Sequence, residues 1–166
     1  IANKSVVVDI VRVLRPKAGS GVKITLIQAI PKKAKMDYIV EKATELGAAS
    51  IVPVFTERTI PDWDDEKKAF CAERWRKIAL EAAKQCSRSD IPAVSDIRSF
   101  SESLKDSSGC SLTLIAALAD GTVGIRQAVA GFQGHSVAIA IGPEGDFTPR
   151  EVKEARDAGF ARLRVE

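Results

Sequence analysis

The chain has 166 residues, of which 45% are hydrophobic and 28% are charged, a balance typical of one globular domain that buries its own core. Its 25 Lys and Arg against 22 Asp and Glu give a net charge of +3, which permits contact with nucleic acid without arguing for it. No apolar run is long enough to span a membrane and no charged-then-apolar leader opens the chain, so we expect no membrane partner.

In chain order, hydrophobic periodicity predicts strands and helices that alternate. Residues 6–14 are strand-like and precede a turn-rich stretch at 16–21, a pattern typical of the end of a preceding domain and a linker. The strands that follow are predicted at 23–28, 50–55, 93–97, 112–118, 136–141 and 160–165. The helices are predicted at 35–46, 65–86, 99–105, 123–130 and 149–158. This order indicates an α/β fold with a mostly parallel sheet and helices on both faces.

Two long helices are expected to bury one face each. For residues 35–46 this face holds Met36, Ile39, Val40, Ala43 and Leu46, and for residues 65–86 it holds Cys71, Trp75, Ile78, Ala79, Ala82 and Cys86. The cysteine count is odd and no CxxC occurs, so buried free thiols are favoured over disulfides. With a single histidine and no Cys/His cluster, we expect no metal site.

The run Gly142-Pro-Glu-Gly-Asp146 carries the strongest signal for a site. It follows a predicted strand and precedes a helix start in which Thr148 caps, Pro149 takes the first position and Glu151 completes a capping box. In open α/β folds this edge of the sheet is where ligands bind. Gly142 and Gly145 would permit close approach of a ligand and tolerate positive φ. A strand-to-helix turn without a ligand explains the spacing equally well.

Polar residues elsewhere give weaker signals. One face of the predicted helix 65–86, extended to the residues just past its end, holds Glu81, Gln85 and Arg88. Arg88 lies in a loop where a guanidinium could bind a phosphate. The alternative is that this face is simply solvated. Lys42 and Glu45 suit ordinary surface pairing. Arg58 follows a strand end, where ligands of a sheet edge bind. His135 lies in a turn, and no GxSxG, P-loop or GxGxxG motif occurs.

Four segments in the same order resemble one family, the RsmE-type ribosomal RNA methyltransferases of the SPOUT class, which have an α/β trefoil knot. They are Lys42-Ala-Thr-Glu-Leu-Gly47, Ile51-Val-Pro-Val-Phe-Thr-Glu-Arg58, Ile78 to Arg88 followed by Ile91-Pro92, and Ile141-Gly-Pro-Glu-Gly145. The resemblance runs from about Lys23 to Glu166. It implies that residues 21–166 form the methyltransferase domain and that residues 1–20 are the tail of a PUA-like barrel plus a linker.

The resemblance also implies an enzyme that transfers a methyl group from S-adenosylmethionine to N3 of a uridine in 16S ribosomal RNA of the 30S subunit, as a homodimer in the cytoplasm. It places the cofactor at Gly142, Pro143, Glu144 and Gly145, with Ala117 and Leu118 on the neighbouring strand. It places Arg58, Gln85, Arg88, Lys42 and Glu45 toward the RNA, with Arg88 as the catalytic candidate. A SPOUT enzyme that acts on transfer RNA and a SPOUT-like RNA-binding module without activity are the alternatives.

The sequence departs from the family pattern in two places. Asp146 stands where the family has Gly, and because Asp is among the residues that tolerate positive φ we expect the loop to keep its shape. The closing motif Leu-Gly-x-Arg-Ile-Leu-Arg-x-Glu-Thr-Ala does not occur before Glu166. The resemblance therefore implies an incomplete knot, weak cofactor binding and an inactive chain, an expectation that micromolar binding in calorimetry would contradict.

Overall fold

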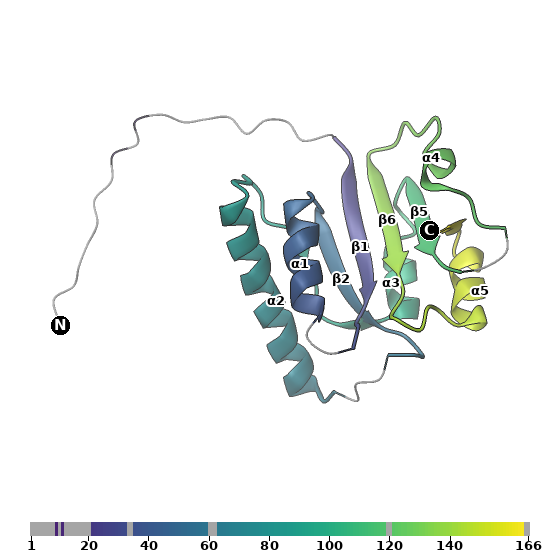
Figure 1. Ribbon diagram of the computed structural model, residues 1–166, viewed down its shortest axis with the longest axis horizontal. Coiled ribbons are helices and arrows are strands. Elements are labelled where there is room, and N and C mark those ends of the chain that lie inside the picture. The colour runs from purple at the N-terminus through teal and green to yellow at the C-terminus, as the bar shows by residue number, and fades with distance from the viewer. Residues whose placement is uncertain are drawn as a thin grey trace.

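The computed structural model describes Asp9, Val11 and residues 21–32, 35–59, 63–118 and 121–164. The predicted strand at 6–14 and the predicted barrel tail at 1–20 therefore lie outside the described residues, apart from Asp9 and Val11. The part of the chain that the structure describes forms one sheet with helices packed against it (Figure 1).

In this described part, the sheet has seven strands and every pairing in it is parallel. The strand order is β3-β2-β1-β6-β5-β7, and β4 also pairs with β2. The strands are β1 (Lys23–Ala29), β2 (Ser50–Phe55), β3 (Ala93–Val94), β4 (Arg98–Ser99), β5 (Leu112–Ala116), β6 (Ser136–Ile141) and β7 (Ala161–Leu163). Because parallel strands need crossovers, helices separate most of them along the chain.

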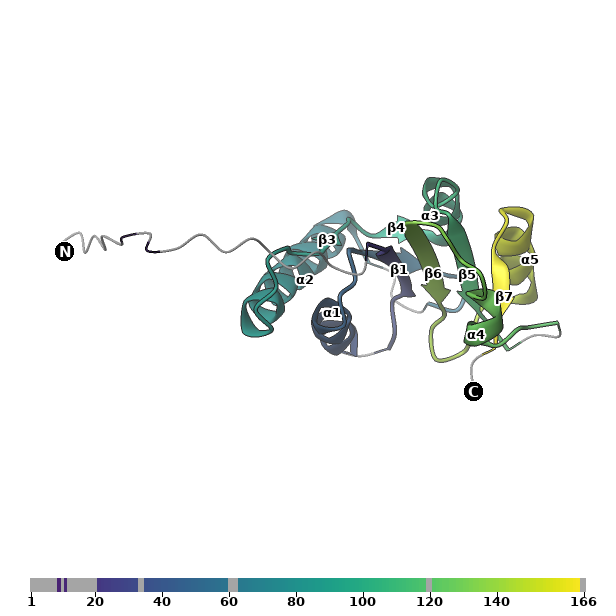
Figure 2. The same cartoon turned by 90° about the horizontal axis from the view of Figure 1, so that it is seen from above.

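The helices are α1 (Lys35–Glu45), α2 (Asp65–Gln85), α3 (Phe100–Asp106), α4 (Ile125–Ala128) and α5 (Pro149–Asp157). Seen from above, α1 and α2 lie on one side of the sheet and α3 and α5 on the other (Figure 2). This arrangement confirms the predicted fold class, a mostly parallel α/β sheet covered on both faces.

Local sequence signals explain where the helices begin and end. Asp64 caps α2 by accepting a hydrogen bond from the Lys67 N–H at 2.7 Å, and Ser99 forms a capping box at the start of α3. Gly47 follows α1 and ends it with a φ of +96°. Glycine suits this position because it adopts a left-handed conformation almost without strain.

Two hydrophobic clusters fill the two faces of the sheet. The first packs α3 and α5 against β1, β5 and β6 and consists of Ile27, Ala29, Val54, Phe100, Leu104, Ile115, Ala117, Ala138, Ala140, Phe147, Ala155 and Phe160. The second packs α1 and α2 against β2 and β3 and consists of Ile30, Met36, Val40, Ala48, Ile51, Cys71, Trp75, Ala79 and Val94. Successive side chains of a strand point to opposite faces, so β2 contributes to both clusters. Ile51 belongs to the second cluster and Val54 to the first.

The structure corrects several sequence expectations. Leu46 is 86% exposed rather than buried, because α1 ends at Glu45 before the stripe reaches it. Cys86 is exposed and Cys110 is half-buried, so only Cys71 is the buried free thiol that we expected of all three. Cys86 takes the C-cap position of α2, one residue past the last helical turn. Of the predicted strand at 93–97 only Ala93–Val94 forms a strand, β3, and the short strand β4 follows it at Arg98–Ser99, where no strand was predicted.

The connections reverse direction between β1 and β6, which are neighbours at the centre of the sheet. From the carboxyl end of β1 the chain continues into α1 on one face, whereas from the carboxyl end of β6 it continues into α5 on the other. Such a topological switch point opens a crevice at the carboxyl edge of the sheet, where open α/β sheets bind ligands.

Candidate functional site

The loop from β6 to α5, residues 142–148, has a rigid, internally hydrogen-bonded shape. The Asp146 N–H donates to the Pro143 carbonyl at 2.9 Å and closes a tight turn. Asp146 has a φ of +59°, and neither Gly142 nor Gly145 has a positive φ. The expectation that Asp tolerates this position is confirmed, and the positive φ that we expected of the two glycines belongs to Asp146 instead.

A side chain at Gly142 would crowd Phe147. A β-carbon on Gly142 would lie 3.2 Å from the ring of Phe147 and 3.3 Å from the Phe147 backbone nitrogen. Phe147 is buried and packs on Phe100 of α3, with ring centroids 4.8 Å apart. The turn therefore lies directly against the core, which holds its backbone in place.

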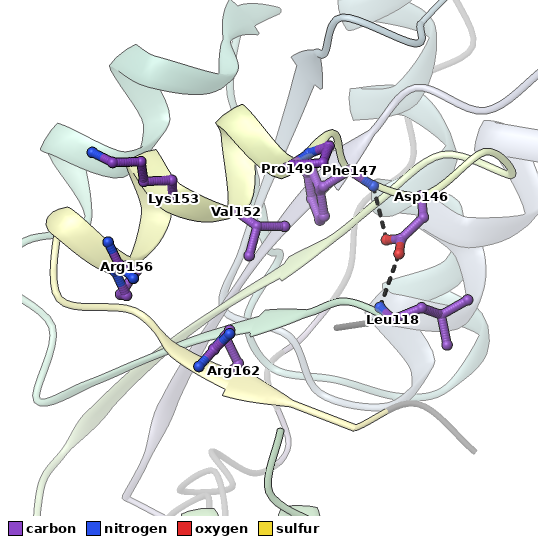
Figure 3. Close-up of a pocket in the computed structure, with 8 residues that line it drawn as sticks. All are labelled: Leu118, Asp146, Phe147, Pro149, Val152, Lys153, Arg156 and Arg162. Carbon is purple, nitrogen blue, oxygen red and sulfur yellow. Dashed lines mark hydrogen bonds between the residues drawn. The ribbon is translucent and has the colours of Figure 1, made fainter. Parts of the chain in front are cut away.

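The Asp146 carboxylate joins this loop to the end of β5. Its Oδ2 accepts a hydrogen bond from the Leu118 N–H at 2.8 Å, and its Oδ1 accepts one from the Phe147 N–H at 2.8 Å (Figure 3). Leu118 lies two residues beyond the end of β5 and is 78% exposed. One side chain thus fixes the relative position of the two segments that the sequence predicted as cofactor-binding.

Glu144 joins the same loop to the connection between β1 and α1. Its Oε2 accepts from the Lys32 N–H at 3.1 Å, and its Oε1 accepts from Lys35 Nζ at 2.8 Å. The hydrogen bond from Lys35, together with that from Lys32, lowers the pKa of Glu144 from its usual 4.5 to about 2. The carboxylate is therefore ionised at any physiological pH, and it bridges the topological switch point between β1 and β6.

A third connection comes from the segment that follows β2. The Arg58 guanidinium donates a hydrogen bond to the Gly145 carbonyl, and the Glu57 N–H donates to Glu151 Oε1 at 2.9 Å. Glu151 is buried and also forms the capping box with Thr148 that the sequence predicted for α5. Loops after β1, β2 and β5 are thus all hydrogen-bonded to the loop and helix start that follow β6.

Between the ends of β5 and β6 lies an open cavity of about 250 Å³, which we call the loop cavity. It is lined by Ala116, Ala117, Leu118, Ile141, Gly142, Pro143, Glu144 and Asp146. Five of the six residues predicted to bind cofactor therefore line one cavity. Gly145, the sixth, does not line it, and its carbonyl faces Arg58 instead. The size is slightly below that of typical small-molecule pockets.

A second cavity of about 260 Å³ lies between α5, β7 and the loop, and the sequence analysis did not predict it (Figure 3). We call it the basic cavity; it is lined by Leu118, Asp146, Phe147, Pro149, Val152, Lys153, Arg156 and Arg162. Asp146 and Leu118 line both cavities. The i, i+3 spacing of Lys153 and Arg156 on α5 was a visible signal, but the contribution of Arg162 from β7 was not.

The residues predicted to face the RNA do not gather in one place. Arg58 lies at the carboxyl edge, beside the loop. Lys42 and Glu45 lie at the end of α1, and Gln85 and Arg88 at the end of α2, near the first residues of β2 and β3. That is the amino edge of the sheet, at the opposite end from the loop cavity (Figure 1).

At the amino edge, Arg88 and Lys42 have protein partners. Arg88 Nη1 donates to the carbonyls of Thr44 at 2.7 Å and Ala48 at 3.0 Å, so it closes the end of α1, and Nη2 forms an ion pair with Asp90 at 2.6 Å. Lys42 contacts Glu41 at 2.8 Å and Glu45 at 2.9 Å, which raises its pKa. The Lys42 contacts match the ordinary surface pairing that the sequence left open. The Arg88 side chain is only 13% exposed, so it does not lie on the solvated face that was its alternative.

The site offers backbone groups, apolar surface and carboxylates at a sheet edge. Among the residues that the structure describes, no three His, Cys, Asp or Glu side chains cluster as metal ligands do. Nor does any helix of these residues combine the length and the hydrophobicity that a membrane crossing would need.

A parallel α/β sheet with a hydrogen-bonded loop cavity at its carboxyl edge defines a ligand-binding α/β domain. Comparison with known proteins identifies the family of this domain. The chain belongs to the RNA methyltransferase domain family, whose model matches residues 19–166. A curated relative, ribosomal RNA small subunit methyltransferase E of Bacillus subtilis, is 34% identical over 137 residues, which is 80% of this chain and 54% of the relative. The chain thus spans about half the length of the curated relatives that it matches.

Solved structures agree with this assignment. The ribosomal RNA small subunit methyltransferase E of Neisseria gonorrhoeae, bound to S-adenosyl methionine, is similar at a TM-score of 0.78 and 32% identity, over 87% of this chain and 59% of that chain. A Legionella pneumophila protein in complex with the bound cofactor SAM is similar at a TM-score of 0.81 and 32% identity, over 88% and 59%.

Proposed function

We propose that this chain is the catalytic domain of an S-adenosylmethionine-dependent enzyme that methylates N3 of a specific uridine in 16S ribosomal RNA of the small subunit. The observation that carries the proposal is the loop cavity, in which Leu118, Gly142, Pro143 and Glu144 meet at the carboxyl edge of the sheet. The relatives named above, two of which were solved with this cofactor, share the family and most of the described chain.

The chemistry suits such a site. In methyl transfer the N3 atom forms a bond to the methyl carbon while the carbon–sulfur bond breaks, and the sulfur keeps the electron pair and becomes a neutral thioether. The N3 proton leaves to solvent or to a base. Because the reaction requires mainly alignment of the acceptor behind the methyl group, a rigid cavity supplies much of the rate.

An arginine near the acceptor would stabilise the anion that develops on the uridine. Arg58 is the predicted arginine at the edge that holds the loop cavity, and it already contacts Gly145. Arg88 lies at the opposite edge of the same chain, with its guanidinium bound to Thr44 and Ala48. A role for Arg88 at the uridine would therefore require a second copy of the chain, in keeping with the homodimer that we propose.

The proposal includes the wider organisation of the protein. A PUA-like barrel would precede residue 21 and contact the RNA, a C-terminal segment would complete a trefoil knot next to the loop cavity, and the enzyme would act in the cytoplasm on the 30S subunit. The relatives' names support a ribosomal RNA substrate.

The test is methylation of 30S particles and of free transfer RNA by the protein with its proposed barrel and C-terminal segment. Tritiated methyl groups are counted and the nucleosides are identified by mass spectrometry. N3-methyluridine in the ribosomal RNA is the expected product. Methylated transfer RNA would point to the other kind of SPOUT enzyme, and no methyl transfer to either would point to a binding module without activity.

Two matched variants connect the activity to the cavity. Gly142→Ala places a methyl group against Phe147 and should reduce both cofactor binding and turnover. Gly109→Ala makes the same change where a β-carbon meets nothing within 4 Å, and it should leave both unchanged. Equal activity in the two variants would remove the loop cavity from the reaction.

A further inference from the structure

The two neighbouring cavities have side chains of opposite charge. The charged residues that line the loop cavity are Glu144 and Asp146. The basic cavity presents Lys153, Arg156 and Arg162, and Asp146 is its one acidic lining residue (Figure 3). Asp146 therefore lies at the boundary between a cavity with acidic side chains and a cavity with mainly basic ones. A cationic ligand is favoured in the first of these, the loop cavity.

The two carboxylates of the loop cavity differ in what compensates their charge. Glu144 forms an ion pair with Lys35 at 2.8 Å, so a cation already neutralises it. Asp146 instead accepts from the backbone N–H groups of Leu118 and Phe147, which orient the carboxylate without adding a positive charge. The negative charge of Asp146 thus remains available to a ligand in the loop cavity.

The proposed reaction changes the charge of the ligand in that cavity. The sulfonium of S-adenosylmethionine carries a positive charge, and the sulfur is neutral after the methyl group has left. The rest of the molecule is unchanged, so substrate and product have nearly the same shape and differ by one unit of charge. A carboxylate in the cavity wall favours the first over the second.

We propose that Asp146 is a specificity-determining residue, which makes the loop cavity bind the cationic sulfonium cofactor more tightly than its neutral thioether product. The inference rests on the proposed function. Loss of the positive charge on methyl transfer weakens binding, so the same carboxylate promotes release of the product.

The size of the effect follows from Coulomb's law. Unit charges about 8 Å apart, roughly the span of such a cavity, in an effective dielectric constant of about 20–40 give a preference of roughly 5- to 30-fold in Kd. Asp146→Asn removes the charge, keeps one acceptor oxygen for one of the two backbone N–H groups and keeps a residue type that tolerates the positive φ.

The test measures the dissociation constants of S-adenosylmethionine and S-adenosylhomocysteine by NMR titration, which reaches the millimolar range, for the full chain and two variants. Asp146→Asn is the test variant. Asp96→Asn is the control, with the same change of net charge at an exposed residue that lines neither cavity. The readout is the ratio of the two constants, because a change of cavity shape alone weakens both ligands alike.

We expect the ratio to favour the sulfonium by roughly 5- to 30-fold in the unchanged chain and in Asp96→Asn, and to fall to about 1–3 in Asp146→Asn. Binding of both ligands with an unchanged ratio in Asp146→Asn would overturn the role of Asp146 and leave the proposed function standing. Binding of neither ligand by the unchanged chain would overturn the cofactor site and this inference with it.

Discussion

The Asp146 carboxylate and the Leu118 backbone N–H, 2.8 Å apart, connect two loops that are 28 residues apart in the chain. The pair forms the common wall of the loop cavity and the basic cavity. Since the same carboxylate also accepts from Phe147, the position of Leu118 is fixed relative to the buried core.

This geometry predicts an order of stability for two substitutions of Asp146. Asp146→Gly loses the carboxylate but adopts a φ of +59° without strain, whereas Asp146→Ala loses the carboxylate and also strains the backbone. We expect Asp146→Ala to be less stable than Asp146→Gly by about 1 kcal/mol. Urea unfolding followed by circular dichroism measures the difference, and equal stability would mean that the loop relaxes out of the left-handed conformation.

Substitution of Glu151 should lower the unfolding free energy by a larger amount. Glu151 is 3% exposed and accepts from the Glu57 N–H at 2.9 Å, the Thr148 N–H at 2.8 Å and the Thr148 hydroxyl at 3.0 Å. Glu151→Ala leaves these donors without an acceptor and should cost about 2–4 kcal/mol of unfolding free energy. Glu154→Ala, on the same helix, should change it by less than about 0.5 kcal/mol. Similar losses for the two variants would argue against this role of Glu151.

Arg88 has a structural role that can be separated from its predicted catalytic one. Arg88→Ala removes the donors to the Thr44 and Ala48 carbonyls and should lower the unfolding free energy by about 2–3 kcal/mol. Lys84→Ala, which breaks an exposed ion pair with Glu81, should cost less than about 1 kcal/mol. The methylation activity of the Arg88→Ala variant, measured at a temperature at which thermal melting shows the variant to be folded, then tests a role of Arg88 at the uridine. Full turnover of the folded variant would exclude that role.

The titration of Glu144 should be visible near the acid limit. Its pKa is lowered from 4.5 to about 2, so its contacts with Lys32 and Lys35 stabilise the folded chain fully above pH 4.5. That contribution is lost as the pH falls from 4.5 through about 2, because the folded protein must then take up the proton. NMR titration of the Glu144 carboxyl carbon measures this, and an inflection near 4.5 would show that the contacts do not persist in solution.

The elements of the fold were readable from the sequence because their signals are local. The strand at 136–141, the cap at Thr148 and the stop at Gly159 depend on neighbours within a few residues, and the structure confirms all three. The ends of the helices were harder to predict. Leu46 and Cys86 continue the hydrophobic periodicity of the helices before them, but α1 ends at Glu45 and α2 at Gln85.

The contacts that build the site were not readable, because they join residues far apart in the chain. Glu144 and Lys35 are separated by 109 residues, and Glu57 and Glu151 by 94. Periodicity places each of them on a loop or a helix but says nothing of its partner. The predicted shared helix face of Gln85 and Arg88 does not extend to Arg88, because α2 ends at Gln85 and Ser87 has a φ of +56°. Nothing in the sequence indicated that the Arg88 guanidinium closes the end of α1.

The central claim is that the cofactor occupies the loop cavity, and amide chemical-shift mapping with S-adenosylmethionine tests it most directly. We predict that the largest changes fall on Leu118, Gly142 and Asp146, with little change at Thr44 and Arg88 on the opposite edge of the sheet. The largest changes at the amino edge, or none around the loop cavity at a saturating concentration, would contradict the account.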